Sequence, residues 1–545
     1  MRPAFLTILV VSSLSFIAGC SHKEENKFEN RTITLNVIHG PVLQSYLSAM
    51  KEKFLQEHSK LSDGTEVKIE LTNEGGVGAA SKIARGVLKA DAWIAPSSSL
   101  INYTNIQLSN LGPRQVDCVQ LFATPIVFAT QPRNASYFHA VDQKFSWNEF
   151  FESRFRASSS GEANSDLFAY NHGNPRVSHT GLSALTQLAY LASYSKESTL
   201  DLDTLKSPHT FEKLKQYEQF VGSYGASEGM LLARAANAGT RRVLFSITSE
   251  QELALYNQSV GGATPALMAL YPSEGSFWND YVLCMSDADW VSPAHRAAYR
   301  AWAEFLQSQQ AQFDVKRAGF RPSVVQFADV EPLTSKFGIN TLLPDKSFLP
   351  VPGEVTSFLF DSWPQLRRPA AVTLLLDTSG SMEGEALAAG KTNFRNLLPG
   401  LRPGDLTALV TFSAEPKVQS ELTSDINAVV DKLNTVQSMG GSALYDGLIK
   451  AIEMSTEEKY NGYRKFIVMF TDGDDKNSEA NLQRLIDIAG TTMADYNINL
   501  YIFGISREGL SYDDLKRVAK AANGTFKEAP IGQVDDLFQN IFSNL

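Results

Sequence analysis

The chain has 545 residues, of which 43% are hydrophobic and 20% are charged. This length exceeds what one ordinary hydrophobic core accommodates, so we expect two or three domains, and the composition excludes a long disordered part. The formal net charge is −10, from 49 basic and 59 acidic side chains, and no marked run of Lys or Arg is present, which argues against nucleic-acid binding.

The first residues have the pattern of an export signal. An apolar stretch follows Arg2, is too short to span a membrane as a helix, and ends at IAGC, residues 17–20. This ending resembles a bacterial lipobox, which implies removal of residues 1–19 and lipidation of Cys20; the alternative is an ordinary secreted protein in which Cys20 is buried. We therefore predict a protein anchored by lipid to the cell membrane or outer membrane, facing the periplasm or the exterior. Residues 20–30 are polar and predict a short tether.

The pattern then alternates between strands and helices. Residues 32–38, 67–71 and 92–95 have the alternating or continuous apolar character of strands. Helical spacing follows Pro41 and again follows the glycines at residues 75–78. This βαβαβ order predicts a parallel sheet. The glycine loop either presents backbone N–H groups to an anion or only forms a tight turn between strand and helix.

The chain from here on resembles the periplasmic solute-binding proteins, the bilobed receptors of ABC importers. The resemblance is carried by ADAW and APSS within residues 90–98, TPIVFA at 124–129, HTGL at 179–182, ALYPSEG at 269–275, SP at 292–293 and GFRP at 319–322. It implies an α/β, bilobed solute-binding-like domain over residues 31–345, with two crossings between the lobes and hinge motion around a cleft. The candidate ligand contacts that the resemblance implies are Ser97, Ser98, Thr180, Gly181 and Tyr271.

Two further cysteines lie in strand-like runs, Cys118 in VDCVQLF and Cys284 in YVLCM. Export permits a disulfide, although the spacing does not show whether the two residues are neighbours. We favour a disulfide between Cys118 and Cys284, with two unpaired cysteines as the alternative.

Prolines accumulate between residues 343 and 369 without helical spacing, and they predict a semi-rigid linker at residues 346–368. After it, residues 369–545 again alternate between apolar strands and helical patterns. The expected strands are residues 372–376, 406–412, 466–470, 499–505 and 525–527. This order predicts a doubly wound, Rossmann-like domain with a mostly parallel sheet.

Three loops of this last domain carry oxygen side chains at the edge where open α/β sheets bind ligands. The first expected strand ends in Asp377, Ser379 and Ser381, a glycine loop carries Ser442, and a later strand ends before Asp472. If both strands lie near the centre of the sheet, Asp377 and Asp472 come side by side. Hydroxyls and carboxylates are hard oxygen donors, which suit Mg²⁺ rather than zinc or copper.

This ordered set resembles the von Willebrand factor type A domain and its metal-ion-dependent adhesion site, D-x-S-x-S…T…D, with Ser442 in place of the family's threonine. The resemblance implies that Asp377, Ser379, Ser381, Ser442 and Asp472 hold Mg²⁺, or another hard divalent cation such as Mn²⁺ or Ca²⁺. The serines would contact the cation, and the aspartates would act mainly through waters and hydrogen bonds. An open position would then take an acidic residue of a partner protein. The alternative is a set of hydroxyl caps at βα turns without metal.

The sequence gives no good match to an enzyme. GASEG at residues 225–229 fits the G-x-S-x-G nucleophile motif, but only a weak strand precedes it, and His295, on an expected amphipathic helix, is the one histidine after it. The DTS that begins at Asp377 is similar to the aspartic-protease motif, but such proteases need Asp-Ser/Thr-Gly twice. His172 and His179 lack a third ligand at zinc-like spacing.

We therefore predict a membrane-anchored binding and interaction lipoprotein. Its type A domain would dock a partner protein through a metal-bridged acid. Its solute-binding-like domain would take a small-molecule solute and set the availability of the type A domain. The alternative function is the substrate-binding receptor of an ABC-type importer, with the type A domain as an accessory.

Overall fold

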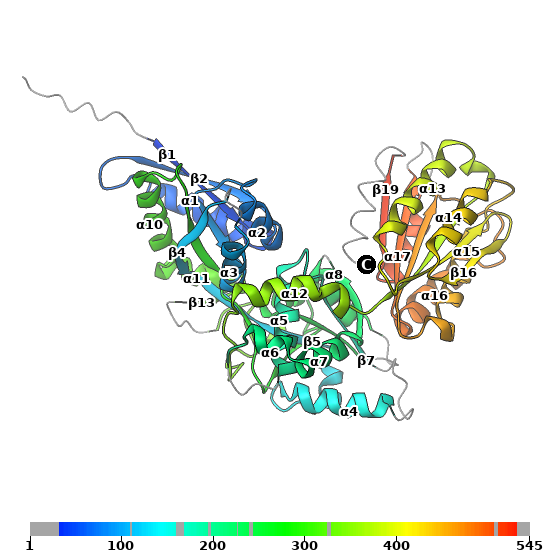
Figure 1. The fold of residues 1–545 in the computed structure, drawn as a ribbon, viewed down its shortest axis with the longest axis horizontal. Helices are drawn as coiled ribbons and strands as arrows, with labels where there is room; N and C mark the ends of the chain where they lie inside the picture. Colours follow the sequence, from blue (N-terminus) through cyan, green and yellow to red (C-terminus); the bar gives the residue numbers. More distant parts are fainter. Residues whose placement is uncertain are drawn as a thin grey trace, which may run out of the picture.

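The computed structural model describes residues 32–108, 112–159, 168–193, 198–225, 227–238, 243–323, 329–505 and 511–530. The predicted leader, Cys20 and the tether at residues 20–30 lie outside the described residues. Figure 1 shows a first lobe, a second lobe and a C-terminal domain, the last in yellow to red. Within the described part of the chain, no helix combines the length and the apolar character needed to cross a membrane.

The first lobe is built on a sheet of strand order β2-β1-β3-β12-β4, and β1 pairs in parallel with β2 and β3, as the βαβαβ pattern predicted. Apolar side chains of these strands pack against the flanking helices around the fully buried Trp302. The strands are β1 (Thr32–His39), β2 (Glu66–Asn73), β3 (Ala92–Ala95), β4 (Arg114–Gln120) and β12 (Val282–Asp287). The helices are α1 (Gln44–Glu57), α2 (Gly76–Ala84), α3 (Ser98–Ile106), α10 (Pro293–Leu306) and α11 (Gln309–Arg317).

The second lobe has a mixed sheet of order β6-β10-β5-β9-β7-β8, to which β11 and β13 add at β5. Its core is rich in aromatic side chains around Trp147 and Phe245. The strands are β5 (Phe122–Thr130), β6 (Lys144–Phe145), β7 (Phe168–Gly173), β8 (Val221–Gly225), β9 (Val243–Ser249), β10 (Met268–Pro272), β11 (Trp278–Asn279) and β13 (Arg321–Pro322). The helices are α4 (Trp147–Ser159), α5 (His179–Ser193), α6 (Leu202–Lys206), α7 (Pro208–Glu218), α8 (Glu228–Ala236) and α9 (Glu250–Val260).

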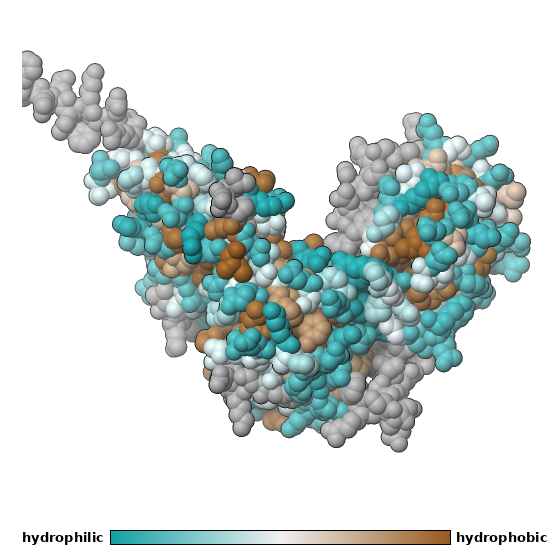
Figure 2. All heavy atoms as spheres, in the orientation of Figure 1, coloured by the Kyte–Doolittle hydropathy of each residue, from teal (hydrophilic) through white to brown (hydrophobic). Residues whose placement is uncertain are grey.

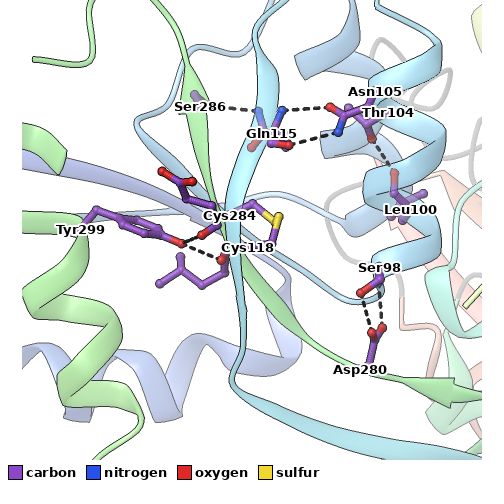
Figure 3. Close-up of a disulfide and its surroundings, with 12 residues drawn as sticks. Ser98, Leu100, Thr104, Asn105, Gln115, Cys118, Asp280, Cys284, Ser286 and Tyr299 are labelled. Atoms are coloured by element: carbon purple, nitrogen blue, oxygen red, sulfur yellow. Dashed lines mark hydrogen bonds between the residues drawn. A yellow bond between two sulfur atoms is a disulfide. The ribbon is translucent and has the colours of Figure 1, made fainter.

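The chain crosses between the lobes where β4 leads into β5, where β11 leads into β12, and a third time between α11 and β13. β4 and β12 are antiparallel neighbours, and a disulfide joins Cys118 of β4 to Cys284 of β12 (Figure 3). Beside it, the hydroxyl of Tyr299 donates to the backbone carbonyl of Leu283 at 2.9 Å. The covalent link therefore holds together the two strands of the first lobe that adjoin the first two crossings.

The prediction of an irregular linker at residues 346–368 is wrong for most of that segment. Residues 353–366 form α12 (Gly353–Leu366), which lies along α3 and packs Leu359 and Trp363 into the core of the second lobe. Pro364 lies in the last turn of this helix, and because it has no N–H it leaves the carbonyl of Phe360 without its helical donor. Arg176 takes that place, since its Nη2 donates to the Phe360 oxygen at 3.2 Å.

The C-terminal domain is the doubly wound domain that the sequence predicted, with strand order β16-β15-β14-β17-β18-β19. All neighbouring strands in this order are parallel except β15 and β16, and the antiparallel edge strand β16 was not among the expected strands. The strands are β14 (Ala370–Asp377), β15 (Leu406–Phe412), β16 (Pro416–Thr423), β17 (Arg464–Thr471), β18 (Ile498–Ile505) and β19 (Thr525–Ala529). The helices are α13 (Glu385–Leu397), α14 (Ile426–Thr435), α15 (Leu444–Ser455), α16 (Leu482–Asp495) and α17 (Asp513–Ala521).

The second lobe and the C-terminal domain meet at the amino-terminal ends of β17 and β18. The guanidinium of Arg464, the first residue of β17, lies 4.5 Å from the ring centroid of Tyr224 on β8. Arg234 of α8 donates to the side-chain oxygen of Asn497 at 2.8 Å and also to Asn499. The carboxyl-terminal edge of the sheet, where Asp377 lies, is therefore the edge away from this joint.

Candidate functional site

The two aspartates of the predicted metal set lie beside each other at the carboxyl-terminal edge of the sheet. Asp377 ends β14 and Asp472 follows β17, and these two strands are parallel neighbours. Asp377 is fully buried, and its carboxylate accepts from the backbone N–H of Ser379 at 2.9 Å and from the hydroxyl of Thr471 at 2.6 Å. These bonds fix the carboxylate within the floor of the site.

The hydroxyls of the first loop lie against the second carboxylate. Ser379 Oγ and Ser381 Oγ are 3.0 Å apart, and Ser381 Oγ donates to Asp472 Oδ1 at 3.0 Å. The loop is shaped by a short 3₁₀ turn, Gly380–Met382, which precedes α13. The N–H of Gly380 donates to the carbonyl of Gly440 at 3.1 Å, which ties the first loop to the loop that carries Ser442.

Within the described residues, Ser442 forms hydrogen bonds through its backbone but not through its side chain. Its N–H donates to the side-chain oxygen of Asn477 at 2.9 Å, and its carbonyl accepts from the N–H of Lys476 at 2.7 Å. The Ser442 hydroxyl is buried and has no hydrogen-bond partner among the residues that the structure describes. A buried hydroxyl without a partner is costly in a folded protein, so its oxygen fits a role as a ligand.

The electrostatics of the site also favour a bound cation. Burial raises the pKa of Asp377 to about 6, and the neighbouring Asp472 adds to the rise. A cation would offset both effects, because it stabilises the ionised carboxylates. In the described residues no group of three or more His, Cys, Asp or Glu side chains could hold a metal ion. The donors are thus two carboxylates and three hydroxyls, a set that suits a hard cation and not zinc.

Two residues of this site were not singled out from the sequence. Thr471 closes β17 and orients Asp377, and Asn477 positions the backbone of Ser442. Thr471 directly precedes Asp472, so its position at the end of the strand could have indicated that it belongs to the site. Asn477 lies in an irregular loop, and no sequence pattern marks its contact with Ser442.

Four of the predicted ligand contacts lie where the two lobes meet. Ser97 caps α3, and the N–H and hydroxyl of Ser98 donate to Asp280 at 2.7 and 2.5 Å (Figure 3). Thr180 and Gly181 lie in the first turn of α5, where Gly181 packs so closely on the backbone of Gly173 that a side chain would not fit. The glycine loop makes a close contact between the lobes, because a Cβ on Gly76 would lie 3.3 Å from that of His179 in the second lobe, and 2.7 Å from Pro96.

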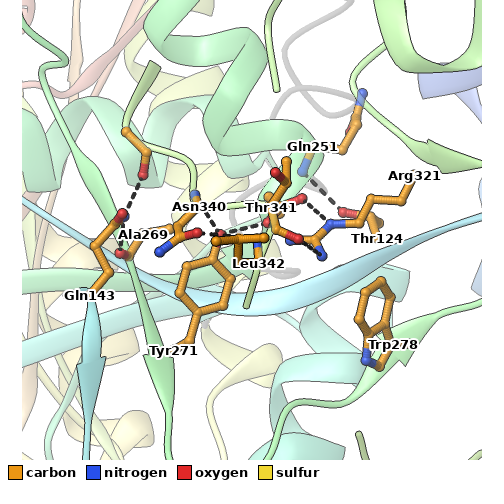
Figure 4. Close-up of polar contacts among 12 residues, drawn as sticks. Thr124, Gln143, Gln251, Ala269, Tyr271, Trp278, Arg321, Asn340, Thr341 and Leu342 are labelled. Carbon is orange, nitrogen blue, oxygen red and sulfur yellow. Dashed lines mark hydrogen bonds and ion pairs between the residues drawn. The ribbon is translucent and has the colours of Figure 1, made fainter. Parts of the chain in front are cut away.

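Tyr271 does not lie with these residues. It is buried in β10, its hydroxyl donates to Glu250 at 2.6 Å, and the N–H of Asn340 donates to that same hydroxyl at 3.3 Å (Figure 4). Glu250 also forms an ion pair with Arg321. The Tyr271 hydroxyl is therefore committed to a buried polar network and supports the fold.

A pair of acids at the first turn of α5 was not predicted from the sequence. Glu228 accepts from the hydroxyl of Ser178, and Glu252 accepts from the hydroxyls of Thr180 and Thr248 at 3.1 and 2.9 Å. Both carboxyl groups are half-buried. Desolvation raises the pKa of Glu228 to about 8, with the charge of Glu252 as a further cause. Glu228 directly follows Ser227 in GASEG, a motif that predicts a nucleophile and not an acid at this place.

His179 and Tyr281 lie near this acid pair. His179 Nε2 and the hydroxyl of Tyr281 are 3.1 Å apart, and burial lowers the pKa of His179 to about 4. The ring of His179 is thus neutral at pH 7. The acid pair consequently has no cationic side chain among these immediate neighbours.

Comparison with known proteins assigns both parts of the chain. The model of the bacterial extracellular solute-binding protein family matches residues 35–321, and that of the von Willebrand factor type A domain matches residues 371–540. An uncharacterized protein of Mycobacterium tuberculosis is 24% identical over 324 residues, which cover 56% of this chain and 46% of the relative. An uncharacterized protein of Synechocystis is 27% identical over 161 residues, 29% of this chain and 37% of the relative. The chain thus spans less than half the length of these curated relatives.

Solved structures similar to each part are also known. A periplasmic thiamin binding protein matches with a TM-score of 0.41 and 14% identity, covering 61% of this chain and 94% of its own. A von Willebrand factor type A protein from Catenulispora acidiphila matches with a TM-score of 0.29 and 20% identity, covering 32% of this chain and 42% of its own. Both families are of binding or adhesion type rather than enzymatic.

Proposed function

Because the chain belongs to the bacterial extracellular solute-binding protein family, we propose that it is a membrane-anchored binding lipoprotein whose C-terminal domain docks a partner protein through a divalent metal. Cys20 would carry the lipid, and the solute-binding module would couple solute binding to the availability of the docking domain. The protein would lie in the periplasm or outside the cell, in keeping with its family.

The observation that carries the docking proposal is the unpartnered hydroxyl of Ser442 beside two adjacent carboxylates. Ser379, Ser381 and Ser442 would hold Mg²⁺, Mn²⁺ or Ca²⁺, with Asp377 and Asp472 supporting them. The bound cation would supply an electrophilic centre for a carboxylate. Because the donor set brings only two negative charges, an acidic residue of the partner would be attracted to the cation. The edge that carries the site lies away from the joint with the second lobe, so a partner could approach it.

Calorimetric titration of Mg²⁺ into the soluble form that begins after Cys20 tests this function. We expect saturable binding that Asp377→Ala abolishes. Asp446→Ala is the matched control, because Asp446 also caps backbone N–H groups in this domain, those of Glu479 and Ala480, and lies outside the metal set. Absence of Mg²⁺ binding in the unmodified protein would refute the docking mechanism.

A second candidate function is favoured by the acid pair of Glu228 and Glu252. The module would be the substrate-binding receptor of an importer. Its solute would carry positive charge, because a protonated amine would stabilise the ionised forms of Glu228 and Glu252, and the nearby His179 is neutral at pH 7. Titration with a diamine such as putrescine, beside a dicarboxylate such as malate, tests this function. Binding of the diamine alone, lost in Glu252→Gln, would support it, and binding of malate alone would exclude it.

A further inference from the structure

An open cavity of about 410 Å³ lies between the two lobes of the solute-binding module. The first lobe lines it with residues of α2 and with Tyr103 of α3. On the opposite side it is lined by Arg176, in the loop between β7 and α5, and by Phe360 of α12. Its volume is in the range of small-molecule sites. The acid pair and the metal set, all of them described residues, do not line it, so this cavity is separate from both sites considered above.

The charged side chains that line this cavity are all cationic. They are Lys82 of α2, Arg85 at the end of α2, and Arg176 of the second lobe. Lys82 forms an ion pair with Glu74, so its charge is already balanced. Arg85 donates from Nε to a carbonyl of its own helix, and Arg176 donates from Nη2 to a carbonyl of α12, both at 3.2 Å. A guanidinium has five N–H groups, so each arginine keeps donors for a ligand.

Opposing charge at the cavity is limited. Among the described residues, no acidic side chain lines it. Asp361 is close by on α12, where it is exposed. Burial and the charge of Asp361 raise the pKa of Tyr103, and the charge of Arg176 opposes this rise. Arg85 and Arg176 are therefore opposed by one exposed aspartate, and a positive charge remains at the cavity.

The neutral part of the lining is largely apolar and aromatic. Val77 contributes an aliphatic side chain, and the rings of Tyr103 and Phe360 meet edge to face with their centroids 5.0 Å apart. Within the described part of the chain, the hydroxyl of Tyr103 forms no hydrogen bond, so it is available to a ligand. Figure 2 shows hydrophobic and hydrophilic surface side by side where the two lobes adjoin. The lining thus suits a ligand with one charged end and one apolar end.

We propose that this cavity binds a small organic anion. Its carboxylate or phosphate group contacts Arg85 and Arg176, and its apolar or aromatic body packs against Tyr103 and Phe360. A planar guanidinium offers paired N–H donors that match the oxygens of such a group, and these hydrogen bonds are charge-assisted. Because Arg85 belongs to the first lobe and Arg176 to the second, the bound anion links the two lobes. The proposal depends neither on the metal site nor on the acid pair.

The test titrates the soluble form that begins after Cys20 with benzoate, phenyl phosphate or benzyl alcohol at constant ionic strength, followed by ligand-observed NMR. We expect at least one of the two anions to bind saturably, and the comparison of benzoate with phenyl phosphate distinguishes a carboxylate from a phosphate ligand. Benzyl alcohol has a similar ring without the charge, so it should bind at least tenfold more weakly. Equal affinity for the alcohol, or no binding of either anion, would overturn the proposal.

Arg85→Gln is the decisive variant, because Arg85 is exposed and its loss removes only a hydrogen bond to its own helix. We expect unchanged stability and at least tenfold weaker affinity for the anion. Arg176→Gln should weaken the affinity in the same way, although it also leaves the carbonyl of Phe360 without its donor. Arg300→Gln is the matched control, because Arg300 is an exposed arginine of α10 that does not line the cavity, and it should leave the affinity unchanged.

Glu252→Gln separates this cavity from the acid pair, and it should also leave the affinity for the anion unchanged. Full affinity in Arg85→Gln would show that the anion binds elsewhere. Loss of affinity in Glu252→Gln would place the anion at the acid pair and would likewise overturn the proposal.

Discussion

Ser442 is the residue at which a structural role and a ligating role can be told apart. Its buried hydroxyl has no partner among the described residues, so Ser442→Ala removes an unsatisfied group. We expect the metal-free protein to be equally stable or up to about 1 kcal/mol more stable, and its Mg²⁺ affinity to fall at least tenfold. Urea unfolding and Mg²⁺ calorimetry on the same sample measure the two effects.

Ser455→Ala is the matched control for this prediction, because the buried hydroxyl of Ser455 donates to the carbonyl of Ala451 at 2.8 Å. It should lose about 1 kcal/mol of stability and bind Mg²⁺ normally. A destabilised Ser442→Ala with full Mg²⁺ affinity would mean that this hydroxyl only supports the loop.

Glu228 makes the stability of the solute-binding module depend on pH. Its pKa is raised from 4.5 to about 8 in the folded protein. Between pH 4.5 and pH 8, the Glu228 carboxyl group is therefore ionised in the unfolded chain and protonated in the folded chain. Stability from this group is therefore full below pH 4.5 and declines as the pH rises towards 8. Glu228→Gln should remove this decline and gain roughly 2 kcal/mol at pH 9, after discounting for the water that reaches the half-buried carboxyl. Unfolding midpoints at pH 5 and pH 9 measure the effect, and an equal pH slope in the variant would contradict it.

Single residues were predictable where they follow strands and unpredictable where the partner is distant in sequence. Asp377 and Asp472 were placed together because each ends a parallel strand of the same sheet, and β14 and β17 are neighbours. The hydrogen bond of Tyr271 to Glu250 was not predictable, because the pattern around Tyr271 does not reveal this buried partner. The acid pair was missed for the same reason, since Glu228 and Glu252 converge on α5 from separate helices.

Helix α12 forms although its local sequence pattern predicts a linker, because tertiary packing outweighs that pattern. Its prolines and the absence of a clear helical period predicted a linker, but Arg176 satisfies the carbonyl that Pro364 leaves open, and Trp363 is almost fully buried against the second lobe. Strand β16 was missed because it is an exposed edge strand, without the continuous apolar run of the central strands. Strands β1 and β3 of the first lobe and β14 and β17 of the C-terminal domain carry apolar runs and were predicted within a few residues.

Trp363→Ala tests the claim that α12 is part of the solute-binding module. The side chain packs against His172 and Tyr224, with ring centroids 5.9 and 4.7 Å away, and its loss leaves a large cavity. We expect the module to lose about 3–5 kcal/mol, seen as a lower midpoint in its own unfolding transition. Trp290→Ala is the control, because Trp290 is 37% exposed, and it should cost far less. If Trp363→Ala unfolds like the unmodified protein, the segment is a linker after all.

At the scale of the whole molecule, the sequence predicted the domains but contained no signal for how they meet. The families and their order follow from local patterns, whereas the joint depends on contacts such as those of Arg464 with Tyr224 and of Arg234 with Asn497, whose partners lie hundreds of positions apart. No periodicity or motif reports such pairs. The joint therefore had to come from the structure, and it is where the two binding functions would influence each other.

Gly222→Ala tests whether that joint is a rigid contact. A Cβ on Gly222 would lie 1.6 Å from Nδ2 of Asn497, whose side-chain oxygen is held by Arg234 and whose backbone has a φ of 51°. The methyl group must therefore displace Asn497 and break its contact with Arg234, at a cost of about 1–3 kcal/mol. We expect the two modules to unfold in more widely separated calorimetric transitions and to scatter X-rays as a more extended particle.

Gly229→Ala, whose Cβ would meet only the Ser227 hydroxyl at 3.8 Å, should change neither measurement. Identical transitions and scattering in Gly222→Ala would mean that the modules are joined by the chain alone, and the coupling between solute and partner would then need another route.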